Sequence, residues 1–167
     1  MLKVSLGLPT KNDYLDYFDS RRVSNPLAVT LSLKQRIELN DFKGLGLKID
    51  KTETSKNTRH FLNRLNQSVF GKSFNRYNRR LAAIPVIEGN TFIRFHVHLT
   101  LQRPDHIEPR IFEKLIYDCW SKTTFGYHNI KIKPIYDYMG WIEYKLKSKS
   151  KDEGLHSSVD WDNVFLH

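Results

Sequence analysis

The sequence lacks the features that define several protein classes. Only one of its 167 residues, Cys119, is a cysteine, which excludes an intramolecular disulfide and a cysteine-rich zinc site. No apolar run approaches the ~20 residues that a membrane-spanning helix requires, and the N-terminus lacks the long apolar core of a secretion signal. No period of about 20 to 50 residues repeats, which excludes a solenoid. We therefore expect no membrane contact and a reducing, cytoplasmic location.

Positive charge is what the sequence has in excess. Lysine and arginine total 27 against 18 acidic residues, so the net charge is +9 and the isoelectric point is about 9.6. This excess favours a polyanionic partner, either a nucleic acid or a membrane surface. The 8 Tyr, 10 Phe and 3 Trp could also stack on unpaired bases, although we expect most of them in the core.

The apolar periodicity predicts four strands and three helices. We expect strands over 27–33, 81–87, 92–102 and 130–135. We expect helices over 54–81, 109–122 and 138–149. The order strand, helix, strand, strand, helix, strand, helix is typical of an α+β fold, a ferredoxin-like antiparallel sheet with helices packed on one face.

The same pattern divides the chain into a domain and two flanking segments. The domain spans 27–150, with an N-terminal extension over 1–26 and a C-terminal tail over 151–167. The extension is mixed and polar, so we expect it on the surface. Within the domain, 34–53 contains two glycines and is expected to be an irregular connection.

The segment His96-Val97-His98 is the sharpest chemical feature. Alternation along 92–102 places the two histidines on one face of the strand, with the apolar residues on the other. Two imidazoles at this spacing can converge on one cation. The alternative is a pair of polar side chains on a solvated sheet face.

Tyr144 and Lys147 form a second candidate pair. At this spacing they lie on one side of the predicted last helix. A tyrosine can act as a covalent nucleophile, and a nearby lysine can stabilise its oxyanion or a phosphate. The alternative is a packed tyrosine beside a run of solvated lysines.

Three segments in this order resemble the motifs of the HUH endonucleases: Thr30-Leu31-Ser32, His96-Val97-His98 and Tyr144-Lys145-Leu146-Lys147. The likeness covers about residues 27–150 and is greatest to rolling-circle replication initiators of small plasmids and phages, of the type with a single catalytic tyrosine. It implies a site-specific nickase and strand-transferase for single-stranded DNA. A Mg²⁺ or Mn²⁺ ion on His96 and His98 would polarise the scissile phosphate. Tyr144 would form a 5′-phosphotyrosine, with Lys147 stabilising the charged phosphate.

The resemblance also implies an acidic or amide ligand beside the two histidines. Glu88 is the nearest candidate, but a two-residue turn at Gly89-Asn90 would pair Glu88 with Thr91. Glu88 would then lie roughly 17 Å from His96. His106 and Glu108 are the substitutes we consider.

Seven basic residues are candidates for phosphate contacts. They are Arg76, Arg79, Arg80, Arg94, Lys131, Lys133 and Lys145. Gly71-Lys72-Ser73 ends like a nucleotide-binding phosphate loop, but Asn66 occupies its first glycine position. We therefore expect no helicase within this chain, and unwinding would come from a host helicase.

Other functions remain open at this point. A transposase or relaxase would use the same three motifs. His98-Leu99-Thr100 also fits the His-x-Thr pattern of two-histidine phosphoesterases, with His156-Ser157-Ser158 as a poor second motif. A non-enzymatic module that binds RNA or single-stranded DNA on the same fold should show exposed aromatics on its strands.

Overall fold

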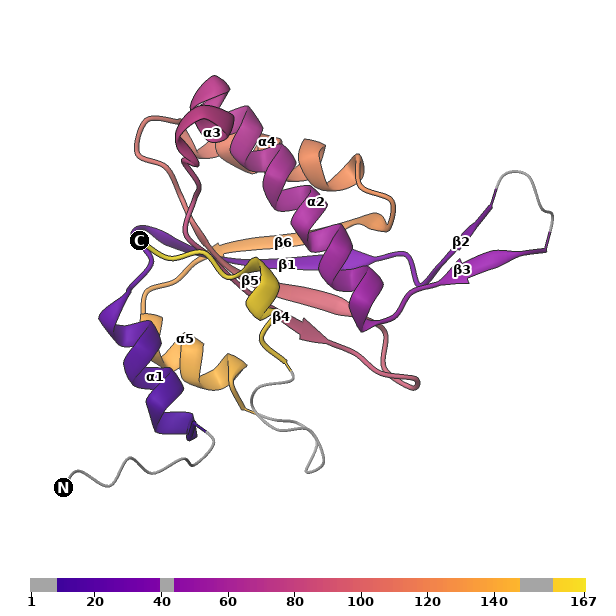
Figure 1. Cartoon of the computed structure of the whole chain (residues 1–167), viewed down its shortest axis with the longest axis horizontal. Helices are drawn as coiled ribbons and strands as arrows, with labels where there is room; N and C mark the ends of the chain where they lie inside the picture. The colour runs from indigo at the N-terminus through magenta and orange to yellow at the C-terminus, as the bar shows by residue number, and fades with distance from the viewer. Residues whose placement is uncertain (1–8, 40–43, 148–157) are drawn as a thin grey trace.

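A computed structural model describes residues 9–39, 44–147 and 158–167 of the chain (Figure 1). Its main sheet has four strands in the spatial order β4-β5-β1-β6, and every neighbouring pair is antiparallel. The strands are β1 (Pro26–Leu33), β4 (Ala83–Glu88), β5 (His96–Gln102) and β6 (Gly126–Pro134). A long helix lies between β1 and β4 along the chain, and another connects β5 to β6. These are two split strand–helix–strand units, so the predicted α+β, ferredoxin-like fold is confirmed.

The two connecting helices cover one face of the sheet. They are α2 (Lys51–Phe70) and α4 (Pro109–Ser121). The Asp50 carboxylate caps α2 by accepting from the Glu53 N–H at 2.7 Å, and Pro109 at the start of α4 loses no helical hydrogen bond. Their apolar faces meet the inward residues of β1 and β5 in one core, which includes Phe61, Leu65, Phe112, Ile116, Trp120, Val29, Leu31, Val97 and Leu99.

The predicted helix over 54–81 is two helices in the structure. It divides at Gly71, whose positive φ of 55° favours glycine, and α3 (Lys72–Tyr77) follows. The predicted irregular connection over 34–53 is also more ordered than expected. It contains a hairpin of β2 (Arg36–Glu38) and β3 (Gly46–Lys48), and the first residues of α2.

The expectation that the helices pack on one face only is wrong. Two further helices pack on the opposite face of the sheet, α1 (Lys11–Ser20) and α5 (Tyr138–Lys145) (Figure 1). Phe18 of α1 is fully buried, so the N-terminal extension contributes to the core instead of lying wholly on the surface. This second core contains Tyr14, Phe18, Val23, Ala82, Ile84, Val86, Tyr138, Ile142, Leu146 and Val159. The outward residues of β1 are half-buried, which shows that the helices cover only part of this face.

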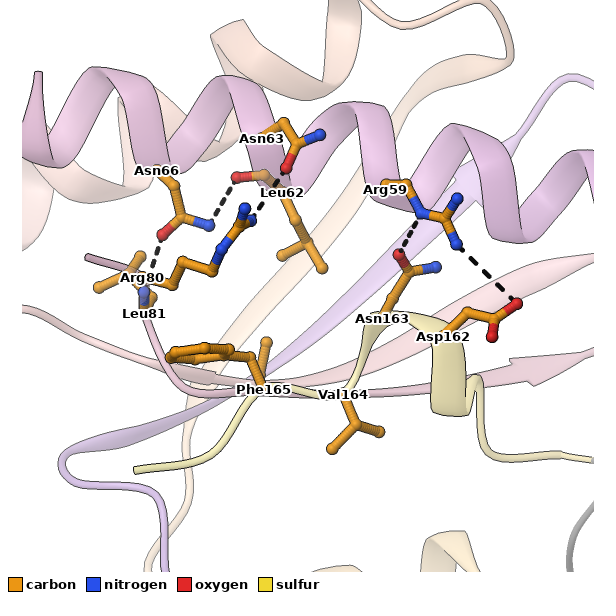
Figure 2. Close-up of a pocket in the computed structure, with 11 residues that line it drawn as sticks. Arg59, Leu62, Asn63, Asn66, Arg80, Leu81, Asp162, Asn163, Val164 and Phe165 are labelled. Atoms are coloured by element: carbon orange, nitrogen blue, oxygen red, sulfur yellow. Dashed lines mark hydrogen bonds and ion pairs between the residues drawn. The ribbon is translucent and has the colours of Figure 1, made fainter. Parts of the chain in front are cut away.

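The end of the chain docks along β4, the edge strand that Pro85 predicted. The backbone groups of Ala83 and Phe165 exchange two hydrogen bonds of 2.7 and 2.9 Å, and the Asp160 N–H donates to the Pro85 carbonyl at 2.9 Å. Figure 2 shows the same segment against α2, where Arg59 donates to Asn163 at 3.2 Å. The segment includes the short helix η1 (Trp161–Asn163). Within the described ranges, no helix combines the length and apolarity needed to cross a bilayer.

Candidate metal centre

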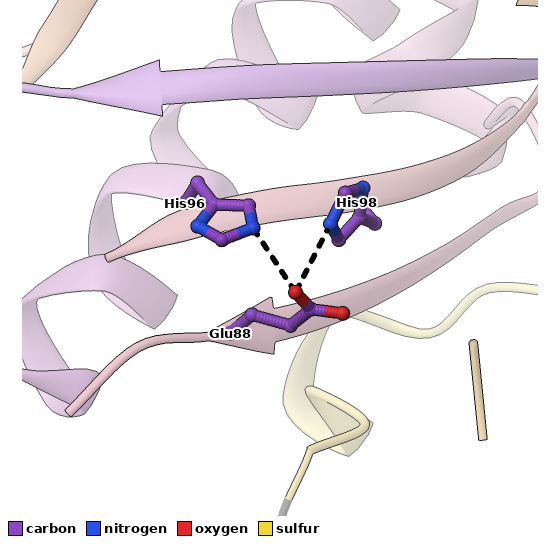
Figure 3. Close-up of side chains that lie close together, drawn as sticks. All are labelled: Glu88, His96 and His98. Atoms are coloured by element: carbon purple, nitrogen blue, oxygen red, sulfur yellow. Dashed lines mark hydrogen bonds and ion pairs between the residues drawn. The ribbon is translucent and has the colours of Figure 1, made fainter. Parts of the chain in front are cut away.

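Three side chains converge where β4 ends and β5 begins. Glu88 and His96 pair directly across the two antiparallel strands, and His98 lies two residues further on the same face. One carboxylate oxygen, Oε2 of Glu88, lies 3.1 Å from Nε2 of His96 and 3.3 Å from Nε2 of His98 (Figure 3). All three candidate ligand atoms lie within 4.8 Å of one another. This compactness is what a single cation requires.

The expected two-residue turn at Gly89-Asn90 is wrong. Strand β5 begins at His96 and not at Phe92, so the loop between the strands is longer and Glu88 pairs with His96 instead of Thr91. The Asn90 side chain closes this wider loop, because its Oδ1 accepts from the N–H groups of Phe92 and Ile93 at 2.8 and 2.9 Å. The separation of roughly 17 Å expected from a tight turn therefore does not exist.

The outer nitrogen of each imidazole has its own partner. Nδ1 of His96 lies 3.0 Å from the carbonyl oxygen of Arg94, which can only accept, so Nδ1 carries the proton. Nδ1 of His98 lies 3.2 Å from the Thr30 hydroxyl. Metal-binding histidines usually make such contacts, which orient the ring and leave the other nitrogen to the ion. Thr30 belongs to the first of the three motifs, and this contact gives it a physical role.

The three groups shift one another's proton affinities. Hydrogen bonds from His96 and His98 hold the pKa of the Glu88 carboxyl far below its usual range. The hydrogen bond to Glu88 raises the pKa of His96, whereas burial lowers the pKa of His98. A divalent cation needs a carboxylate and neutral imidazoles, so the shifts at Glu88 and His98 favour its binding, whereas at His96 the cation must displace a proton.

Tyr144 lies on α5, the helix that packs on the same face as His96 and His98. The indole N–H of Trp141 donates to the Thr100 hydroxyl at 2.9 Å, which ties α5 to β5 two residues beyond His98. Tyr144 is 55% exposed, so its phenol is open to a substrate.

Lys145 connects the tyrosine to the three converging side chains. Its Nζ lies 4.8 Å from the centre of the Tyr144 ring and 4.7 Å from that of Trp141, while the residue is only 8% exposed. The charge of this ammonium adds a smaller effect to those of the hydrogen bonds and burial: it acts in the lowering direction on the pKa of Glu88 and of His98, and it opposes the overall rise in the pKa of His96. We expect Lys145 to contact DNA, and the structure instead places its ammonium over two aromatic rings, where its charge acts on the three groups of the candidate centre. In the sequence, the only signal for this placement is that Lys145 directly follows Tyr144.

Lys147 is placed differently from our expectation of a helical neighbour of Tyr144. Helix α5 ends at Lys145, so Lys147 lies beyond the helix with an exposed side chain. The hydrogen bond from Lys11 lowers the pKa of Glu143 on α5, and the charge of Lys147 adds a smaller effect in the same direction. The expected helix extended to 149, and residues 148 and 149 lie outside the described part of the chain.

A basic pocket opens beside His96 on this face. It has a volume of about 270 Å³ and is lined by Thr30, Ser32, Leu33, Arg94, Phe95, His96, Asn129 and Lys131. Lys133 lies two residues beyond Lys131 on the same face of β6. Three of the basic residues predicted to contact phosphates therefore share the face of the candidate centre.

Apart from Lys145, the remaining predicted phosphate contacts lie with the helices on the opposite side of the sheet. The guanidinium groups of Arg76, Arg79 and Arg80 lie over the rings of Tyr77, Phe70 and Phe74. Arg80 also donates to Asn63 of α2 at 3.1 Å (Figure 2). The structure does not bring these three arginines to the candidate centre.

The substitutes considered for the third ligand have other roles. Glu108 caps α4 by accepting from the Ile111 N–H at 3.1 Å, and the His106 ring lies 6.2 Å from the Phe70 ring. Among the described residues, only Glu88, His96 and His98 form a group that could hold a metal ion.

The structure gives less support to the alternative functions. Thr100 is buried and accepts a hydrogen bond from Trp141, so the His98-Leu99-Thr100 pattern does not present its hydroxyl to a ligand. His156 and Ser157 lie outside the described residues. The open face of β5 carries His96 and His98 and no aromatic platform. Comparison with protein-family models, curated proteins and solved structures returns no match for this chain.

Proposed function

We propose that this protein is a metal-dependent nickase and strand-transferase of the HUH type that acts on single-stranded DNA and initiates rolling-circle replication of a plasmid or phage. One observation carries the proposal. A carboxylate oxygen lies within 3.3 Å of two imidazole nitrogens on one face of the sheet. Helix α5, which carries the exposed Tyr144, packs on the same face. Lys145 links the two parts, because its ammonium contacts the Tyr144 ring and acts on all three ligand groups.

Glu88, His96 and His98 would hold the ion. A divalent cation there supplies Lewis acidity, polarising the scissile phosphate and offsetting its charge. Two nitrogen donors and one oxygen donor suit Mn²⁺ better than Mg²⁺, which prefers a shell of oxygens. Thr30 and the Arg94 carbonyl orient the two imidazoles, so the donor set is arranged before the ion arrives.

Tyr144 carries the covalent step. Its phenolic oxygen attacks the phosphorus, the bond from phosphorus to the 3′ oxygen breaks, and the departing 3′ oxygen gains a proton as the phenol loses one. The product is a 5′-phosphotyrosine and a free 3′ hydroxyl. One phosphoester replaces another, so the reverse attack by a 3′ hydroxyl rejoins strands without an external energy source. Lys145 stabilises the negative charge on the phenol, and Lys147 contacts the phosphate.

The basic residues of the open face hold the strand. Arg94 and Lys131 line the pocket beside His96, and Lys133 extends the positive charge along β6. Such contacts to phosphates position a strand without reading its sequence. The substrate must reach the site already unpaired, and a host helicase would supply it.

The experiment that tests the proposal looks for the covalent product. The protein is incubated with Mn²⁺ and a pool of randomised single-stranded DNA labelled at either the 5′ or the 3′ end. A 5′-phosphotyrosine retains the 3′-labelled fragment, so only that label should migrate with the protein after denaturation. Tyr144→Phe and His96→Ala should each abolish the adduct.

A matched control comes from another exposed tyrosine. Tyr136 is 94% exposed and lies just before α5, so Tyr136→Phe should leave the adduct unchanged. An adduct that persists in Tyr144→Phe would refute the assignment of the nucleophile. Cleavage that survives both EDTA and Tyr144→Phe would instead favour a metal-free phosphoesterase.

A further inference from the structure

The loop that joins the two strands of the candidate centre presents an unusual side chain. Phe92 is 96% exposed, the highest value among the large hydrophobic residues in the described part of the chain. Burying a phenylalanine is worth roughly 2 kcal/mol, so a fold gains nothing by displaying one. Phe95, three residues later, packs against the core instead. Ile93, next to Phe92, is also 55% exposed, so the tip of the loop presents two apolar side chains to solvent while Phe95 anchors its base.

Hydrogen bonds hold the loop in one shape. Asn90 accepts from the N–H groups of Phe92 and Ile93 and donates its own N–H to the Ile93 carbonyl at 2.9 Å. At the base of the loop, Gln35 accepts from the Phe95 N–H at 2.8 Å and donates to the Phe95 carbonyl at 3.0 Å. A ring on a folded loop loses little conformational freedom when it binds a ligand.

Gly89 shows how closely the loop is packed. Its φ is +139°, and a Cβ at this position would lie 2.6 Å from the Cα of Phe95. Only glycine fits there, so the loop turns sharply as it leaves Glu88.

The position of the ring relative to the ligands indicates what it binds. Phe92 lies four residues after Glu88 and four before His96, at most about 14 Å along an extended chain from either. Arg94 and Lys131 line the pocket next to His96. Cations and a metal site recognise phosphates, whereas an exposed aromatic ring recognises a flat apolar surface. An unpaired nucleotide is a ligand that offers both.

We propose that Phe92 is a stacking residue that binds an unpaired nucleobase close to the phosphate held at the candidate metal centre. In a duplex each base is already stacked between its neighbours, so this contact selects single strands. The inference rests on the proposed nucleic-acid substrate and names a recognition element within it. The ring does not touch the reacting atoms, so Phe92 positions the substrate and is not a catalytic residue.

Binding without catalysis tests this inference. The probes are a fluorescein-labelled oligothymidylate and an abasic strand of equal length, titrated by fluorescence anisotropy in EDTA. Phe92→Ala should weaken binding of the oligothymidylate by about 5- to 150-fold and leave binding of the abasic strand unchanged. Lys131→Ala should weaken both, because it removes a phosphate contact.

Three variants separate stacking from other effects. Phe92→Tyr retains the ring and should bind like the wild type, whereas Phe92→Leu is apolar without a ring and should bind like Phe92→Ala. Tyr77→Ala removes another exposed aromatic, on α3, and should change nothing. All of these side chains are exposed, so the variants should fold normally.

The outcomes distinguish this inference from the proposed function. If Phe92→Ala binds both strands like the wild type, the stacking role is refuted. If the covalent adduct forms but Phe92 has no effect, the proposed function stands and only this inference fails. If Phe92 and the bases matter but no DNA gives an adduct, the stacking role stands and the nickase proposal fails.

Discussion

The two faces of the sheet differ although they are built from the same strands. On the face under α2 and α4, Val29, Leu31 and Leu99 are fully buried. On the opposite face, their neighbours Thr30 and His98 are only half-buried and bond to each other at 3.2 Å. One face therefore supplies stability, while the other has room for polar groups that need a ligand.

The second face is itself divided. Helices α1 and α5 cover the part where β4 presents Ile84 and Val86, and leave open the part with Glu88, the two histidines and Lys131. Residues that are adjacent in sequence should therefore respond differently to substitution. Four predictions test this contrast, beginning with the largest effect.

The largest difference in stability loss should be between substitutions of Leu99 and of His98. Leu99→Ala opens a cavity under α2 and α4 and should lower the free energy of unfolding by about 2 to 5 kcal/mol. His98→Ala removes hydrogen bonds at a half-buried position and should cost only about 1 to 2 kcal/mol in EDTA. Urea denaturation measures both. Equal losses would contradict the division of roles between the faces.

Metal binding should stabilise the folded protein, and this gain should depend only on the ligands of the open face. Mn²⁺ at about 100 times its dissociation constant should raise the free energy of unfolding by roughly 2.7 kcal/mol. EDTA should reverse this, and Glu88→Gln or His98→Ala should abolish it. Leu99→Ala, although less stable, should keep the full increment. Thermal unfolding with and without Mn²⁺ measures each case, and an increment that survives Glu88→Gln would exclude the proposed ligand set.

Without metal, the contribution of the open-face residues to folding stability should depend on pH. The pKa of folded Glu88 is lowered, so its contribution is present above the unfolded value of 4.5 and is lost as the pH falls. The pKa of folded His96 is raised, so its contribution is present below the unfolded value of 6.5 and is lost as the pH rises through the folded pKa. In EDTA, Glu88→Gln should therefore cost most between these pH values, about 1 to 3 kcal/mol.

Urea denaturation across the pH range, with Leu99→Ala as a pH-insensitive control, measures this window. Mn²⁺ should move the optimum upward, because the ion competes with protons for the imidazoles. A cost of Glu88→Gln that did not vary with pH would contradict the pairing.

The smallest effect should come from the surface of the covering layer. Lys11 of α1 and Glu143 of α5 form an exposed ion pair at 2.9 Å. Lys11→Met should cost only about 0.2 to 1 kcal/mol, and added salt should reduce the difference. A larger loss in urea denaturation that added salt removes would mean that this pair, and not the apolar packing of Phe18, holds α1 on α5.

Some parts of this molecule could be predicted because their signals are local. Alternation along β5 correctly places both histidines on one face, and the periodicity of α4 is right to within one residue of its end. Apolar periodicity does not predict α1, because its apolar residues are few and Thr10, which caps it, is the main local signal of its start. Lys145 was assigned to the DNA surface because charge alone does not show whether an ammonium lies over two aromatic rings.

By itself, the sequence determined the order along the chain of the main-sheet strands and the helices that connect them, the faces of the alternating strands and the identity of the two histidines, since each follows from spacing along a few residues. Only the tertiary structure decided that Glu88 meets them, because the register of β4 against β5 depends on how the loop closes. It also decided which half of the second face α1 and α5 leave open. Register and coverage are long-range outcomes, set by the packing of segments that are distant in sequence.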